Sequence, residues 1–319
     1  MNICLSHMSY PTNLQQEQGD QRDDSDNLGE EPALVVMDQL KAPVSVTFDS
    51  NVWESIADLG KLAVHPDSAT LGEIRKAIED KRVTPYISDV VVLLESIAKA
   101  DRGKFFAEIK TSARRSEPDV SSNPGGVPGI THRLTINALF DHFPQLHEKL
   151  SSALEQAFVL GFKLISVPRI GWMRLDDHLY KPQEADESSI GVRLERTHHA
   201  ARSFEGAGCG AAWAQKLGSD AIAKDAQVAA RTNRNPFFAL SYCDDKDAIP
   251  GAVAEWADGD ALAAHHGHSH DVFCTLDQGR GAGARSVLHN SRRQWLDSDF
   301  GIVILTPVEL AARLPAPTA

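Results

Sequence analysis

Two short apolar runs in the sequence are each followed by an aspartate. Val44–Phe48 precedes Asp49, and Val272–Leu276 precedes Asp277. Both runs are rich in β-branched and aromatic residues, which predicts strands. The segments between them carry helical patterns, so the two strands are expected to be parallel. If they are neighbours, their carboxyl ends share the sheet edge at which open α/β proteins bind ligands.

Two carboxylates at that edge would repel each other. Adjacent strands lie about 4.8 Å apart, so one carboxyl pKa rises unless a cation lies between them. Oxygen ligands favour Mg²⁺ or Mn²⁺ over zinc, and either ion assists phosphoryl chemistry by activating water and neutralising developing charge. Asp49 and Asp277 therefore predict a divalent-metal site. The alternative is that each aspartate only caps a helix or a turn.

Two more carboxylates complete a pattern along the chain. Glu95 lies in an apolar helix predicted to begin at Ser88 or Asp89, and Asp260 opens the sequence Asp-Ala-Leu-Ala-Ala. Together these motifs resemble the PIN-domain nucleases over about residues 43–100 and 252–315. The motifs that carry the resemblance are Asp49-Ser50-Asn51, Glu95, Asp260–Ala264, Thr275-Leu276-Asp277 and the closing run 302–310.

The resemblance implies a fold and an activity. The expected fold is α/β, a three-layer α/β/α sandwich with a mostly parallel central sheet and a helical insertion. The implied activity is that of a hydrolase, an endoribonuclease that cleaves single-stranded or structured RNA with Mg²⁺ or Mn²⁺. The implied catalytic and metal-binding residues are Asp49, Glu95, Asp260 and Asp277, and Asp258 is the rival for the third position.

Polar side chains beside these acids have two readings. In the resemblance, Asn51 and Thr275 hold ligand carboxylates or metal-bound water. Equally, Asn51 caps a helix and Thr275 is an ordinary strand residue.

A basic stretch follows Asp277, with no acidic residue between Arg280 and Arg293. Arginines in a glycine-rich loop are typical of phosphate contacts. We therefore expect Arg280, Arg285, Arg292 and Arg293 to bind substrate, with a mobile surface loop as the alternative.

Other functions are weighed against the nuclease. A catalytically inactive PIN-like scaffold would bind a protein partner through its tail or insertion. A phosphatase with Asp49 as nucleophile would need a second aspartate where Asn51 stands. A toxin role, common among small relatives, conflicts with the length of 319 residues.

Two further patterns predict no site. His265, His266, His268 and His270 are expected on one exposed helix end rather than around one ion. Glu205–Gly210 imitates a dinucleotide-binding motif, but no strand precedes it. Four widely spaced cysteines are read as free thiols.

Composition predicts a soluble cytoplasmic protein. The chain is 42% hydrophobic, with no apolar run long enough for a membrane span and no signal pattern. A net charge of −12 argues against a general nucleic-acid coat but not against a local basic groove. We expect a disordered acidic tail over 1–42 and one nuclease domain over 43–319, with an insertion at about 101–250.

Periodicity gives the remaining elements. Helices are predicted over 51–62, 70–80, 134–161, 210–217 and 219–231, and strands over 83–87 and 162–167. Residues 110–129 are predicted to be a loop and 168–196 to be irregular.

Overall fold

A computed structural model describes residues 40–41, 43–98, 101–102, 110–115, 119–121, 129–131, 134–139, 146, 148–167 and 190–316. Apart from residues 40 and 41, the predicted tail lies outside these residues, and so does the interval 168–189. The contacts divide the chain into two units, one containing 110–139 and the other 38–109 with 140–319. Each unit is described separately.

A five-stranded, all-parallel sheet forms the centre of the larger unit. Its order is β7-β2-β1-β8-β9. Phe48 at the end of β1 pairs with Ile87 on one side and with Cys274 on the other. The prediction that the two aspartate-bearing strands are parallel neighbours is confirmed. The strands are β1 (Val44–Phe48), β2 (Val83–Ser88), β7 (Lys163–Ile165), β8 (Val272–Cys274) and β9 (Ile304–Leu305).

Helices connect these strands. Before β7 they are α1 (Ser50–Ala57), α2 (Leu59–Val64), α3 (Ser68–Glu79), α4 (Asp89–Ser96) and α6 (Glu148–Leu160). Between β7 and β8 they are α7 (Ile190–Gly206), α8 (Ala212–Lys224), α9 (Ala226–Arg231), α10 (Pro236–Ala239), η3 (Leu240–Tyr242) and α11 (Ala248–His268). After β8 they are η4 (Gly283–Arg285), η5 (Asn290–Arg292), α12 (Arg293–Phe300) and α13 (Pro307–Arg313).

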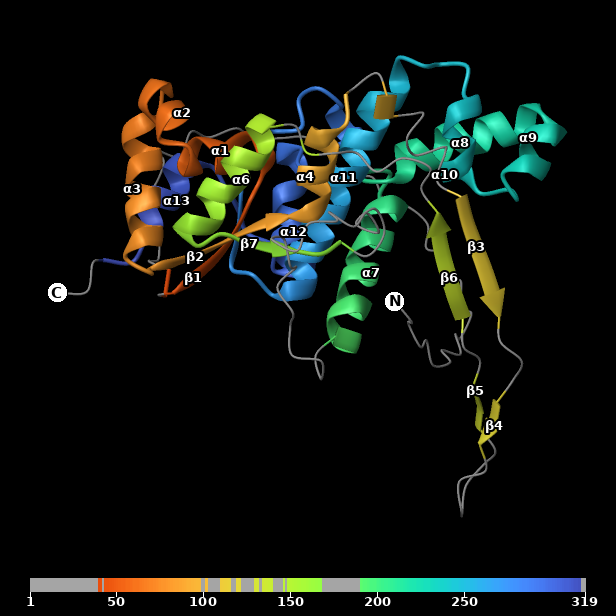
Figure 1. Cartoon of the computed structure of the whole chain (residues 1–319), viewed down its shortest axis with the longest axis horizontal. Coiled ribbons are helices and arrows are strands. Elements are labelled where there is room, and N and C mark those ends of the chain that lie inside the picture. The colour runs from red at the N-terminus through yellow and green to blue at the C-terminus, as the bar shows by residue number, and fades with distance from the viewer. Residues whose placement is uncertain are drawn as a thin grey trace, which may run out of the picture. The chain divides into compact units, whose positions relative to one another are not determined.

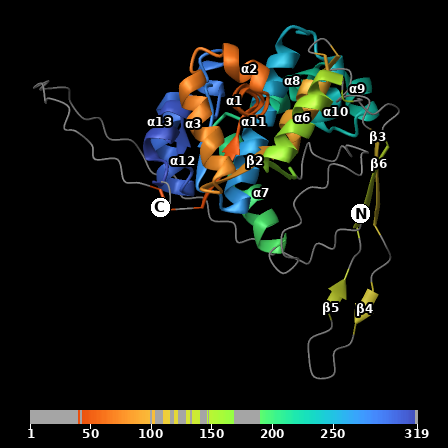
Figure 2. The same cartoon turned by 60° about the vertical axis from the view of Figure 1, so that its left-hand side comes forward.

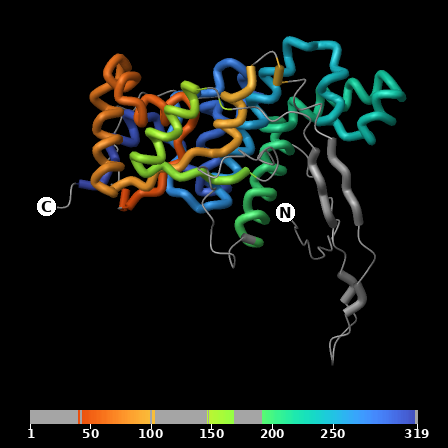
Figure 3. The backbone as a smooth tube through the Cα atoms, in the orientation of Figure 1, coloured from red at the N-terminus to blue at the C-terminus, as the bar shows by residue number. Residues whose placement is uncertain are grey.

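The helices of this unit pack in two groups. In one, α1 contacts α3 and α6, and α13 lies beside α3 (Figures 1 and 3). In the other, α11 packs along α7 and against α4 and α8 (Figures 1 and 2). From β1 the chain adds β2 and then β7 on one side, and it later adds β8 and β9 on the other side of β1. Because crossovers are right-handed, connections that run in opposite directions along the sheet lie on opposite faces. The unit is thus α/β and compatible with three layers.

The smaller unit contains two antiparallel strand pairs. β3 (Lys110–Arg115) pairs with β6 (Leu134–Leu139), and β4 (Asp119–Ser121) pairs with β5 (Gly129–Thr131). The predictions of a loop over 110–129 and of a helix from 134 were therefore wrong. The four-residue spacing that predicted a helix is realised in α6. Residues 134–139 instead form β6, which pairs with β3 in the segment whose proline and glycine residues predicted a loop.

Part of the predicted insertion of 101–250 belongs to the larger unit. Within it, α6 contacts α1, and β7 is hydrogen-bonded to β2 as the edge strand of the central sheet. Two helix predictions also change. The helix predicted over 51–62 breaks at Asp58, whose side chain accepts hydrogen bonds from Gly60 and Lys61 at the start of α2. The irregular region predicted to reach residue 196 gives way to α7 at Ile190.

The apolar helix α11 contributes many buried residues to the core of the larger unit. It lies close to the turn between α7 and α8, because residues 259 and 210 are both glycines. A Cβ atom on Gly259 would stand 2.7 Å from the Cα atom of Gly210. Of the glycines in 205–210, which imitate a nucleotide-binding motif, Gly210 makes this close approach, and Gly208 and Gly210 adopt positive φ in the turn.

Substitution of Gly259 by Ala should destabilise the protein by about 1–3 kcal/mol, the usual cost of overpacking, because the added methyl meets backbone. Gly72→Ala in α3 is the matched control. Nothing lies within 4 Å of its added Cβ, so it should stabilise the helix by up to about 1 kcal/mol. Urea unfolding of both variants tests this, and equal effects would contradict the packing argument.

Candidate functional site

Asp49 lies at the carboxyl end of β1 and caps α1. Its backbone N–H donates to Cys274 of β8 at 3.0 Å, and its Oδ1 accepts from Ser50 N at 2.7 Å. The side chain is only 5% exposed. Burial raises the pKa of Asp49 and the charge of Asp277 raises it further, while hydrogen bonds from Thr275, Ser50 and Asn51 oppose the rise. Asp49 is thus both a cap and part of an acidic site.

Asn51 and Thr275 connect the ends of β1 and β8. The Thr275 hydroxyl donates to Asp49 Oδ2 at 2.6 Å and accepts from Asp277 N at 2.9 Å. Asn51 Nδ2 donates to the same Asp49 oxygen at 3.0 Å, and Asn51 Oδ1 accepts from Leu276 N at 3.0 Å. Both side chains therefore hold Asp49 and the backbone after β8 in place.

Asp277 and Glu95 approach Asp49 from different elements. Asp277 follows β8, is partly buried, and accepts from Gly279 N at 2.7 Å. Glu95 comes from α4, and its Oε2 is buried without a hydrogen-bond partner. Burial raises the pKa of Glu95 to about 7, the Asp49 charge adds to the rise, and Lys61 and Arg102 oppose it. The structure thus brings Glu95 and Asp277 each within electrostatic reach of Asp49.

Of the two candidates for the third acid, Asp258 is the one within electrostatic reach of Asp49 and Asp277. Burial raises the pKa of Asp258 well above its ordinary value, and Asp49, Glu255 and Asp277 add to the rise. Asp260 instead accepts from Trp256 Nε1 at 3.1 Å and raises the pKa of Asp89. Residues two apart on a helix point about 200° apart, so α11 cannot direct both aspartates to one site. The helix geometry therefore favours Asp258 over Asp260 for the third position, and the choice between them stays a prediction.

Glu255 was missed by the sequence reading. It is 8% exposed, its Oε2 has no hydrogen-bond partner, and its pKa is raised by burial and by Asp277. The available signal was its spacing of three residues from Asp258, which puts both on one face of α11. Glu255 extends the acidic cluster toward the loop after β8.

The chemistry of this cluster suits a hard cation. Several carboxylates share one partly buried region, and two of them, Glu95 and Glu255, have an oxygen without a partner. Such a set of oxygens matches the preference of Mg²⁺ or Mn²⁺. As the side chains stand, no three His, Cys, Asp or Glu residues in the described part of the chain are close enough to hold one ion. Binding would therefore require side-chain rotation.

The four predicted substrate arginines separate into two pairs. Arg280 and Arg285 are exposed in the loop after β8. Arg292 donates to the carbonyls of Ala207 and Ala284 at 3.0 and 2.6 Å. Arg293 donates to Ile304 O at 3.4 Å and lies 3.9 Å from Glu309. Arg292 and Arg293 hold protein backbone, which leaves Arg280 and Arg285 accessible to a ligand.

The histidine group is not the exposed helix end predicted from sequence. His265 is buried, and its Nδ1 lies 3.0 Å from Thr47 Oγ1, which also lies 2.8 Å from His270 Nδ1. His270 stacks on Tyr86 with ring centroids 3.9 Å apart. Burial lowers the pKa of His270 to about 3 and that of His268 to about 4. These rings are neutral packing groups between α11 and the sheet.

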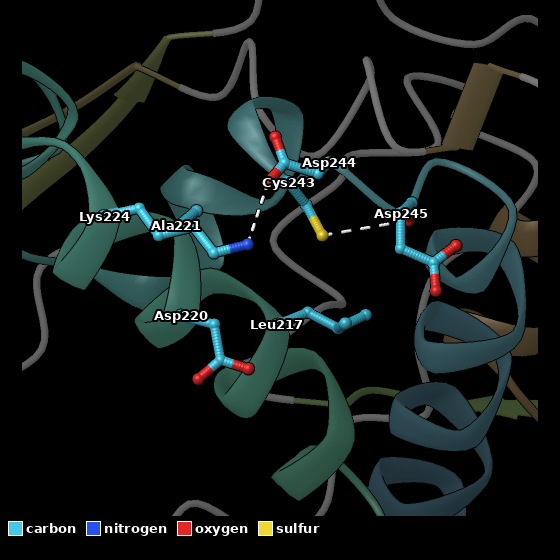
Figure 4. A pocket seen from close by; sticks show the side chains of 7 residues that line it. All are labelled: Leu217, Asp220, Ala221, Lys224, Cys243, Asp244 and Asp245. Carbon is cyan, nitrogen blue, oxygen red and sulfur yellow. Dashed lines mark hydrogen bonds and ion pairs between the residues drawn. The ribbon is translucent and has the colours of Figure 1, made fainter.

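A surface hollow on α8 and the turn before α11 contains an ion pair. Lys224 Nζ lies 2.8 Å from Asp244 Oδ2, and the Cys243 thiol lies 3.7 Å from the Asp245 carbonyl oxygen (Figure 4). Both charged partners are exposed. The hollow is lined by Leu217, Asp220, Ala221, Lys224, Cys243, Asp244 and Asp245.

The predicted free thiols are confirmed for Cys209, Cys243 and Cys274, all buried, while Cys4 lies outside the described residues.

Comparison with known proteins adds no family assignment. A scan against family models finds no match, and searches of the curated proteins and of the solved structures find no similar protein. In the part of the chain that the structure describes, no helix is long and apolar enough to cross a membrane. The fold and the site therefore define the class no further than an α/β protein with an acidic cluster at the carboxyl edge of its sheet.

Asp89 is a buried carboxyl within electrostatic reach of Asp260. Its Oδ1 accepts from Val167 N at 3.0 Å, which joins the start of α4 to the end of β7. Burial raises the pKa of Asp89 to about 8, the Asp260 charge adds to the rise, and hydrogen bonds from Val167 and Ser166 oppose it. Above its ordinary pKa the unfolded chain releases this proton while the folded protein retains it. Asp89 therefore costs stability as pH rises toward 8.

Asp89→Asn should remove that pH dependence while keeping an acceptor for Val167. Relative to the unsubstituted protein, the variant should gain stability between about pH 4 and pH 8, with no gain below this range, where both states bind the proton. Urea midpoints at about pH 5 and pH 8 measure the difference, with exposed Glu155→Gln as the control for loss of one carboxylate. A gain that does not grow with pH would contradict the assigned protonation.

Proposed function

We propose that this protein is a metal-dependent nuclease of the PIN-like type, an endoribonuclease that hydrolyses phosphodiester bonds. One observation carries the proposal. Asp49, Asp258 and Asp277, with Glu95 beside them, gather where the neighbouring central strands β1 and β8 end. This edge of an open parallel sheet is where α/β proteins bind ligands.

Asp49, Asp258 and Asp277 would hold the ion, with Glu95 and Glu255 within electrostatic reach. Bound there, Mg²⁺ or Mn²⁺ supplies an activated water and offsets the charge that develops on the phosphate. Mutual repulsion supports this reading, because crowded and partly desolvated carboxylates gain most from a cation. Removal of any one of them both relieves repulsion and deletes a ligand.

The surrounding side chains have separate roles in this proposal. Asn51 and Thr275 fix the orientation of Asp49 through bonds at 3.0 and 2.6 Å. Glu95, with a pKa of about 7, can hold or release a proton near neutral pH beside the reacting phosphate. Exposed Arg280 would position the phosphate backbone, and exposed Arg285 would add positive charge on the same loop. The substrate choice of RNA comes from the resemblance of the motifs, not from a base-reading contact.

Asp258→Asn should abolish hydrolysis of single-stranded RNA in Mn²⁺ or Mg²⁺. The loss should exceed the roughly 10–100-fold cost of removing a residue that only orients a ligand. Asp260→Asn is the matched control on the same helix, and it should retain activity because its side chain faces Trp256 and Asp89. Both variants are compared at equal folded fraction, judged by thermal melting. Loss of activity in Asp260→Asn alone would restore the motif-based choice.

A catalytically inactive scaffold remains the second candidate, and two observations favour it. No three metal-binding side chains are closely placed among the described residues, and both Asp49 oxygens already accept hydrogen bonds. A scaffold of this kind would use the same fold to bind a protein partner. It would have no need for a cation.

Added Mn²⁺ separates the two candidates. A ligand that binds only the folded state at 100 times its Kd stabilises it by about 2.7 kcal/mol. The nuclease proposal expects Mn²⁺ to raise the melting temperature of the unsubstituted protein and to have little effect on Asp49→Asn. Melting curves with EDTA or Ca²⁺ serve as references. An unchanged melting temperature together with absent RNA hydrolysis would favour the scaffold.

A further inference from the structure

An arginine lies over the ring of a tryptophan near the acidic cluster. Arg285 Cζ is 3.9 Å from the centre of the Trp213 ring, a distance typical of a strong cation–π contact. Arg285 is exposed, and Trp213 is partly buried against the core. In the described part of the chain, neither Arg280 nor Arg285 forms an ion pair with a carboxylate. The guanidinium of Arg285 is therefore preorganised without being neutralised.

Contacts with neighbouring segments hold both Trp213 and Arg285 in place. α11 approaches Trp213 closely because residue 251 is glycine, and a Cβ there would meet the ring at 3.0 Å. Arg292 holds the carbonyl of Ala284, the residue before Arg285, and ties it to Ala207. The positions of ring and guanidinium are thus set by packing and backbone contacts rather than by a ligand.

Two observations relate the Trp213–Arg285 pair to the proposed site, one an electrostatic interaction and the other a surface hollow. The pKa of Glu255 is raised first by burial and then by Asp277, whereas Arg285 opposes the rise, so Glu255 lies within reach of both. A surface hollow beside Asp277 is lined by Leu276, Gln278, Arg280 and Gly281. Leu276 is 38% exposed there. An apolar side chain and a cation therefore flank the acidic cluster on the same loop.

We infer that Trp213 and Arg285 form a stacking platform for one base of single-stranded RNA, while Arg280 contacts a neighbouring phosphate at the hollow beside Asp277. The inference rests on the proposed function and specifies its substrate as a single strand. A guanidinium plane stacks on aromatic faces, and its outer face can stack on a base in the same way. Bases in a duplex keep both faces covered, so the platform favours unpaired RNA.

Binding is measured by fluorescence anisotropy in EDTA with a labelled single-stranded RNA and with the duplex of the same sequence. EDTA prevents metal-dependent cleavage, so binding is read separately from activity. Arg285→Lys keeps the charge and removes the planar group, and Arg280→Ala removes a charge. Trp213→Phe keeps a ring, and Trp213→Leu removes it. Exposed Arg231→Ala in α9 is the control for loss of a positive charge elsewhere.

Arg285→Lys and Trp213→Leu should each weaken single-strand binding roughly fivefold or more, the effect of losing one stacked base. Arg285→Lys should leave the slope of log affinity against log salt unchanged, whereas Arg280→Ala should make it shallower. Trp213→Phe should bind nearly as well as the unsubstituted protein, which separates stacking from a folding defect. Arg231→Ala should match the unsubstituted protein.

Equal affinity of Arg285→Lys and the unsubstituted protein for the single strand would overturn the platform, as would tighter binding of the duplex. If hydrolysis occurs but these variants bind normally, the inference fails and the nuclease proposal stands. If the platform variants lose binding but no hydrolysis occurs in Mn²⁺, the nuclease proposal fails and the platform stands.

Discussion

The hydrogen bond from Thr275 to Asp49 joins residues 226 positions apart, and the site depends on it. The bond is 2.6 Å long and connects the carboxyl ends of β1 and β8. Asn51 adds to this connection, because its Nδ2 donates to Asp49 and its Oδ1 accepts from Leu276 N. Parallel strands cannot be joined by a short turn, so a long connection separates these groups in the sequence, and pairing of β1 with β8 brings them together. The acidic site is thus a product of sheet topology.

Carboxylate crowding has opposite consequences for stability and for function. Asp49, Glu95, Asp258 and Glu255 all have raised pKa values, with burial as the first cause of each. Water solvates separated carboxylates better than this cluster does, so the arrangement costs folding free energy. Groups held at such a cost are concentrated at functional sites, which gives the cluster a physical claim to be one.

The loop after β8 combines structural and accessible arginines. Arg292 and Arg293 bind backbone carbonyls, and Arg285 is held on Trp213 while remaining exposed. Four residues with the same charge in one basic stretch therefore have different surroundings. All four follow Asp277 in the sequence, but backbone contacts leave Arg292 and Arg293 less exposed than Arg280 and Arg285. The same packing explains the glycines at 210 and 259.

The sequence by itself determined the strands that end at Asp49 and Asp277, their parallel pairing, and α3, because periodicity and β-branched runs act over short distances. It also placed Asn51 and Thr275 beside the acids. Only the tertiary structure decided that α11 directs Asp258 rather than Asp260 to the cluster, that Glu255 joins it, and that β7 completes the sheet. Those outcomes depend on helix rotation and on contacts between distant segments, which set the surroundings of a residue and leave no local pattern in the sequence.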